Sequence, residues 1–148
     1  MLADPGLVHA AKLAGAASSC GMAGVIWFVQ VVHYPLLARV GREGYAEYQR
    51  VHESRTTLVV APLMLVEVGS AVLLAWLLRG TAQAGLGHLG AALVVLVFAS
   101  TFLVQVPLHG RLSRGFTAAT HRRLVLSNWA RTALWTAHAG VSLALLRA

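Results

Sequence analysis

Charged residues fall in clusters along the chain and leave four long apolar intervals between the clusters. The intervals cover residues 13–38, 56–78, 81–108 and 124–146. Each exceeds the roughly 20 residues that cross about 30 Å of hydrocarbon at about 1.5 Å per residue in a helix. The pattern predicts four transmembrane helices, which we place at about residues 9–38, 45–79, 84–109 and 118–147.

The composition strengthens this interpretation. Of 148 residues, 57% are hydrophobic and 11% are charged, whereas charged residues make up about a quarter of soluble domains. The first interval lacks a basic leader and a small-residue cleavage site, so we expect it to remain as the first helix. The connecting segments are too short for a soluble domain. We therefore expect one all-α domain over residues 1–148, an integral membrane four-transmembrane-helix bundle.

The basic residues predict the orientation of this bundle. Eight of the 12 lie in two connections, which carry Arg39, Arg42, Arg50 and Arg55, and Arg111, Arg114, Arg122 and Arg123. By the positive-inside rule both connections face the cytoplasm and both termini lie outside, in the inner (plasma) membrane of a cell. This placement explains the formal charge of +7 without a nucleic-acid partner.

Two short stretches of the chain resemble each other. VQVVHYPLLAR at 29–39 and VQVPLHGR at 104–111 both carry a histidine, a proline and an arginine after Val-Gln-Val. One interpretation is two related helix pairs with a site between them. The other is that helix ends at the same membrane face select similar residues.

Several polar side chains fall at similar depths in the predicted spans. Assuming alternating helix directions, the cytoplasmic half of the bundle gathers Gln30, His33, Glu67, Gln105, His109, Asn128 and Arg131. A charge in hydrocarbon costs from ~3 to over 10 kcal/mol, so it must face a partner or water. We expect Glu67 and Arg131 to pair, directly or through a shared ligand, with Asn128 and Trp135 on the same inward face as Arg131.

These residues suggest a pocket for a small apolar or aromatic ligand. The candidate catalytic residues are His33, His109, Arg131 and Asn128, and the candidate ligand-binding residues are Gln30, Glu67, Gln105 and Trp135. Alternatively, the same groups only fix helix packing in a structural or assembly subunit. The remaining histidines, His9, His88, His121 and His138, are expected at interfaces or on the surface.

Metal content and oligomeric state stay open at this point. His33, His109, Glu67 and His52 could supply ligands for iron, copper or zinc, but their spacing matches no metal motif, so we favour no cofactor. The single Cys20 allows no internal disulfide. Small residues along the first helix allow close helix approach and a homo-oligomer.

A series of short signals resembles a known family. The series comprises Gly24-Val25, Pro35, Pro62, Thr101, Val106-Pro107-Leu108, Arg111-Leu112 and Asn128-Trp129-Ala130-Arg131-Thr132. It is similar to the small four-helix membrane family that includes the anthrone oxygenases, whose patterns read N-V-P-L-N-x-x-L and W-x-x-x-N-x-x-R. Here Gln105 and His109 replace the two asparagines, and Leu124 stands at the tryptophan position.

The resemblance implies a cofactor-independent oxygenase acting on a flat phenolic or quinone-like molecule. Asn128 and Arg131 would then hold or polarise a phenolic or keto oxygen, and a histidine would take the proton whose loss makes the carbanion reactive to dioxygen. A second likeness, Trp27-Phe28 followed by Pro35, is similar to the first helix of the membrane-bound protoporphyrinogen oxidases. That likeness implies a haem- or metal-binding oxidoreductase.

Overall fold

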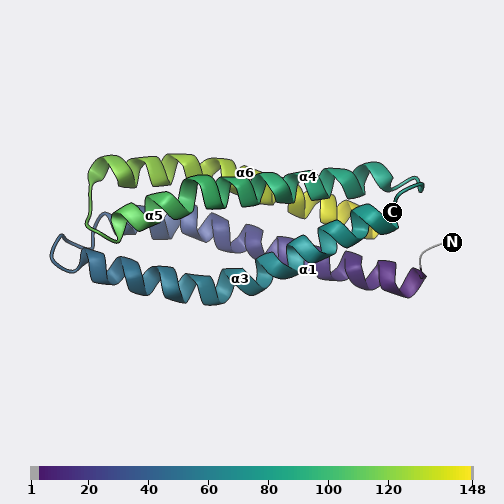
Figure 1. The fold of residues 1–148 in the computed structure, drawn as a ribbon, viewed down its shortest axis with the longest axis horizontal. Helices are drawn as coiled ribbons and strands as arrows, with labels where there is room; N and C mark the ends of the chain where they lie inside the picture. The colour runs from purple at the N-terminus through teal and green to yellow at the C-terminus, as the bar shows by residue number, and fades with distance from the viewer. Residues whose placement is uncertain (1–3, 148) are drawn as a thin grey trace.

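A computed structural model describes residues 4–147, which form four long helical rods and no strand (Figure 1). The first rod is α1 (Pro5–Phe28), η1 (Val29–His33) and α2 (Tyr34–Leu37), and the second is α3 (Tyr45–Leu77). The third is α4 (Ala84–Ser100), η2 (Thr101–Gln105) and α5 (Val106–Leu112), and the fourth is α6 (Ala118–Arg147). The all-α four-helix bundle predicted from the sequence is confirmed.

The rods follow one another around the bundle. α1 packs against α3 and α6, and α4 packs against the same two helices. The start of α1 and the end of α6 lie at one end of the bundle, and the connections at 38–44 and 113–117 lie at the other (Figure 1). All eight arginines of the two basic clusters are exposed near this second end, which we call the arginine-rich end.

The bundle places apolar side chains outside and polar ones inside. Leu58, Leu65 and Leu103 are 71%, 68% and 76% exposed, whereas Glu67 and Asn128 are fully buried. This is the reverse of a soluble globule, in which charged residues are almost never fully buried unless they are paired. The distribution indicates a protein surrounded by lipid.

Three of the four rods are long and apolar enough to cross a membrane: Pro5–Leu37, Tyr45–Leu77 and Ala84–Leu112. The sequence predicted four crossings, but α6 does not meet the same criterion. Its buried face carries polar groups, among them Asn128, Arg131, Thr132, His138 and Ser142, and these lower its mean hydropathy. Length and composition therefore support three membrane crossings. A fourth crossing, by α6, depends on how that helix packs against the other rods.

The first and third rods share a rare local structure. Each contains a five-residue π-helix, η1 and η2, that ends two residues before a proline, Pro35 or Pro107. The π-helices begin 101 − 29 = 72 residues apart, and the prolines are 107 − 35 = 72 residues apart. The Val-Gln-Val triplets do not share this register, since 104 − 29 = 75. The π-helices and prolines support two related helix pairs, α1 with α3 and α4 with α6.

Small residues bring the helices close together inside the bundle. A Cβ atom at Gly87 would lie 3.3 Å from the backbone oxygen of Leu74, and one at Gly15 would lie 3.2 Å from Ser70 Oγ. Ser18 and Ser19 are buried and bond to carbonyls of their own helix. Much of the small-residue face expected to allow an oligomer therefore packs within the bundle itself.

Candidate ligand-binding cavity

A cavity of about 470 Å³ lies in the half of the bundle nearer the arginine-rich end. Its apolar wall includes Met22, Ile26, Val29, Val60 and Met64, and its polar wall includes Tyr34, His52, Glu53, Gln105, His109 and Arg131. Thr57, Phe102 and Val106 also line it and are exposed on the bundle surface, so the cavity opens between α3 and η2–α5. Small-molecule pockets in proteins have volumes of about 300–1,000 Å³.

Arg131 enters the cavity from α6 and is only 8% exposed. Its Nη1 donates to Asn128 Oδ1 at 3.1 Å, and its guanidinium lies over the Trp135 ring, 4.7 Å from the centroid. Its Nε is buried and has no hydrogen-bond partner among the described residues. An unmade hydrogen bond of this kind costs about 1–3 kcal/mol or more for a charged group, so the cavity contains a strong donor that a ligand could satisfy.

Gln105, at the end of η2, supplies an unpartnered acceptor and lines the same cavity. Its Nε2 donates to Ser127 Oγ at 2.8 Å, while its buried Oε1 has no partner in residues 4–147. Ser127 lies four residues before Arg131 on α6, so the two share one helix face about one turn apart. The cavity therefore offers a ligand both an N–H donor and a carbonyl acceptor.

Asn128 and Gln30 lie behind Arg131 and outside the cavity lining. Asn128 Nδ2 donates to Gln30 Oε1 at 2.8 Å, and Gln30 Nε2 donates to the Val125 carbonyl at 3.3 Å. Since Asn128 also accepts from Arg131, this pair of amides links α1 to α6 and orients the guanidinium. Of the predicted site residues, these two position the cavity rather than line it.

The structure separates the two predicted histidines, because only His109 lines the cavity. Tyr34 Oη and His109 Nε2 are 2.8 Å apart, and His109 Nδ1 is 2.7 Å from Gln49 Nε2. His109 therefore lines the cavity with both ring nitrogens already bonded. His33 does not line it; its Nε2 lies 2.9 Å from Nδ1 of His52, which does.

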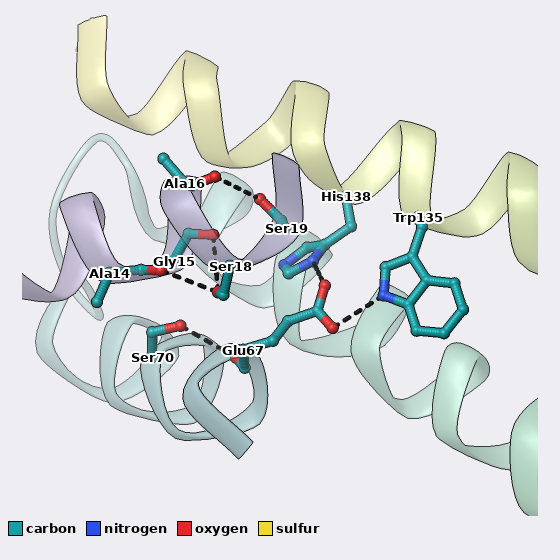
Figure 2. A network of polar contacts seen from close by, with 9 residues as sticks. All are labelled: Ala14, Gly15, Ala16, Ser18, Ser19, Glu67, Ser70, Trp135 and His138. Carbon is teal, nitrogen blue, oxygen red and sulfur yellow. Dashed lines mark hydrogen bonds and ion pairs between the residues drawn. The ribbon is translucent and has the colours of Figure 1, made fainter. Parts of the chain in front are cut away.

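Glu67 belongs to a separate polar cluster (Figure 2). Its Oε1 lies 2.6 Å from His138 Nδ1, and its Oε2 accepts from Trp135 Nε1 at 2.9 Å. The expected direct pair between Glu67 and Arg131 is wrong, because Trp135 bonds the carboxylate through its N–H and lies under the guanidinium. Neither Glu67 nor Trp135 lines the cavity. Of the predicted ligand-binding residues, Gln105 therefore lies at the cavity, whereas Glu67 and Trp135 belong to the separate cluster.

His138 was expected at the surface or an interface, and this is wrong: it is 3% exposed and bonded to Glu67. The missed signal was helical spacing. The predicted inward face of the fourth helix ended at Trp135. His138 and Ser142, three and seven residues after Trp135, lie on the same face and are also buried.

Sequence reasoning also missed polar side chains of α3 that contact the cavity. Glu53 and Thr56 line it beside His52, and Gln49 is fully buried behind them. The sequence analysis identified tyrosine and histidine on this segment but not the i, i+4 spacing of Gln49 and Glu53. That spacing places both side chains toward α5, where Glu53 also accepts from Ser113 Oγ.

Within residues 4–147 no three histidine, cysteine, aspartate or glutamate side chains are arranged to hold a metal ion. His33 and His52 are joined by a hydrogen bond instead. Comparisons of the chain with protein-family models, curated proteins and solved structures found no match.

Proposed function

We propose that this protein is an integral membrane protein that binds a flat, partly apolar molecule through a phenolic or keto oxygen. One observation carries the proposal: Arg131 Nε and Gln105 Oε1 are buried and unpartnered in the described residues, and both residues line the same cavity. A ligand with an oxygen acceptor and a hydroxyl donor would complete both groups. Met22, Ile26, Val60 and Met64 would cover its apolar body.

We propose that the ligand enters from the lipid. The cavity opening lies between Thr57, Phe102 and Val106, on a bundle whose outer surface is apolar. In our proposed orientation the arginine-rich end faces the cytoplasm, in the inner membrane of a cell. α6 packs between α1 and α4 and returns the chain to the end at which it began, which favours four crossings.

The chemistry we propose is removal of a proton from the bound molecule. Arg131 would stabilise charge on the ligand oxygen, and the imidazoles that line the cavity are those of His52 and His109. Loss of the proton is the step that would make a phenolic or keto compound reactive to dioxygen, as the resemblance to the anthrone oxygenases implies. His109 has both ring nitrogens bonded, so the proposed base is His52, whose bonds to His33 and Thr56 both use Nδ1.

Calorimetric binding to the protein in lipid nanodiscs tests the proposal. We expect 1-naphthol to bind at one molecule per chain and about tenfold or more tighter than naphthalene, which has the same rings but no oxygen. Arg131→Gln should abolish the difference, while Arg122→Gln, which removes an exposed charge of the same helix, should not. Equal affinities for the two compounds in the unaltered protein would refute the pocket.

A further inference from the structure

The buried guanidinium of Arg131 has no anionic partner. Within residues 4–147 the ion pairs join Arg50 to Glu47 and His138 to Glu67, and none includes Arg131. Asn128 and Trp135 contact the guanidinium, but neither neutralises its charge. An uncompensated buried charge is strongly destabilising, so an anion in the cavity would be favoured over a neutral ligand of the same shape.

The hydrogen bonds behind the cavity have a definite direction, which the carboxylate of Glu53 determines. An ionised carboxylate only accepts hydrogen bonds, so the group of Gln49 that lies 3.1 Å from Glu53 Oε1 is the amide nitrogen. The same nitrogen lies 2.7 Å from His109 Nδ1. His109 Nδ1 must therefore accept, which places the ring proton on Nε2.

This direction continues to Tyr34. His109 Nε2–H donates to the Tyr34 oxygen at 2.8 Å, and Arg131, whose guanidinium can only donate, lines the same cavity as Tyr34. The hydrogen-bond neighbour of the phenolic oxygen is therefore a donor. The hydroxyl proton of Tyr34 is thus left to point elsewhere, and Tyr34 lines the cavity.

We propose that Tyr34 and Arg131 form an oxyanion site, in which the Tyr34 hydroxyl and Arg131 Nε–H both donate to an ionised phenolate or enolate oxygen. Glu53, Gln49 and His109 are positioning residues that orient the Tyr34 proton toward the cavity. The inference rests on the proposed function, since it requires that the cavity bind an oxygenated ligand. A phenol that binds as its anion releases its proton to the solvent.

The probe for this site is 4-nitrophenol, whose anion absorbs at longer wavelength than the neutral form. The protein in nanodiscs is titrated with the probe at the pH at which the free probe is half ionised. We expect the bound probe to be about nine-tenths ionised or more, because an adjacent opposite charge shifts such an equilibrium by at least about one pH unit.

Two variants with matched controls test the individual residues. Tyr34→Phe should lower the anion-to-neutral ratio of the bound probe about tenfold, because it removes one hydrogen bond to a charged oxygen; Tyr48→Phe, which alters an exposed tyrosine, should not. Glu53→Gln should lower the ratio by a smaller factor, because the amide of Gln49 is then free to turn. Glu47→Gln removes an exposed carboxylate of the same helix and should leave the ratio unchanged.

The ionisation of the bound probe distinguishes the oxyanion site from ligand binding alone. A mostly anionic probe that becomes more neutral in Tyr34→Phe and Glu53→Gln supports the oxyanion site. A probe that binds in its neutral form, or a ratio that neither variant changes, overturns the oxyanion site while leaving ligand binding intact. If neither the probe nor 1-naphthol binds, the proposed function itself fails. If Tyr34→Phe does not fold, Glu53→Gln decides the inference.

Discussion

Arg131 combines features that are costly unless a ligand or solvent satisfies them. It is buried, charged and held by Asn128 and Trp135 in one orientation, yet its Nε has no partner in the described chain. The two amides behind it, Asn128 and Gln30, make good hydrogen bonds and are fully buried or nearly so. We infer that this arrangement preorganises a donor for a ligand.

The Arg131→Lys variant shows how much of the ligand affinity depends on the positive charge and how much on the shape of the guanidinium. Lysine keeps the positive charge but lacks the planar guanidinium and its unpartnered Nε–H. We expect Arg131→Lys to weaken 1-naphthol binding by about 10- to 100-fold, which corresponds to the roughly 1.5–3 kcal/mol of a hydrogen bond to a charged group. Calorimetry of the variant checks this, and an unchanged affinity would show that charge alone is sufficient.

Replacing Glu67 should change the stability of the protein rather than its affinity for a ligand. Its two oxygens accept from Trp135 and pair with His138, and it lies outside the cavity lining. We expect Glu67→Gln to lower the free energy of unfolding by about 1–3 kcal/mol, because one buried contact loses its acceptor. Unfolding in detergent measures this change, and 1-naphthol affinity should remain within about twofold. A large loss of affinity with normal stability would assign Glu67 to the site.

At the scale of elements, the two π-helices have the clearest consequence for the site. Each supplies a buried glutamine, Gln30 from η1 and Gln105 from η2. A π-turn bonds residue i to i+5 and therefore holds one residue more than an α-turn. Each π-helix thus contains an extra residue relative to a continuous α-helix.

Deletion of a single residue tests this description of η2. Removing Leu103, an exposed residue of η2, should convert the π-turn into an α-turn and leave α4 and α5 in register. We expect the variant to fold, with a melting temperature within a few degrees of the parent. Removing Leu96, an exposed residue of α4, should rotate the following segment by about 100° and unfold the bundle. Unfolding of both variants alike would show that η2 does not contain an extra residue.

Hydrophobic periodicity predicted the rods well and their interior only in part. The four apolar intervals gave helix bounds within a few residues of those observed, except where α1 begins at Pro5. The depth of each polar residue correctly grouped Gln105, His109 and Arg131. The depth of a residue in the membrane could not show that Trp135 would lie between Arg131 and Glu67. Which side chains pair across the bundle depends on how each helix is rotated about its own axis. For the same reason the sequence did not reveal Tyr34 or Gln49.

For the whole molecule, the number of membrane crossings depends on α6. Three rods satisfy the length and composition for crossing, while α6 combines similar length with a polar buried face. Because α6 packs along α1 and α4, its polar face is shielded by protein. A helix shielded in this way crosses lipid at lower cost than its mean hydropathy suggests.

Cysteine labelling in intact cells tests this topology. In a Cys20→Ala background we expect a membrane-impermeant thiol reagent to label Thr81→Cys and Arg147→Cys, which are exposed at the end where the chain starts and finishes. Glu43→Cys, at the arginine-rich end, should react only after the cells are opened. Protection of Arg147→Cys together with labelling of Thr81→Cys would show that α6 does not return across the membrane.

The most direct test of the account is the position of a bound ligand. A crystal structure of the protein in lipid with a brominated 1-naphthol would locate the bromine by its anomalous signal. We predict bromine within the 470 Å³ cavity among Met22, Val60 and Met64, with the naphthol oxygen within hydrogen-bond distance of Arg131 Nε. Bromine found only on the lipid-facing surface, with Arg131 Nε bonded to ordered water, would contradict it.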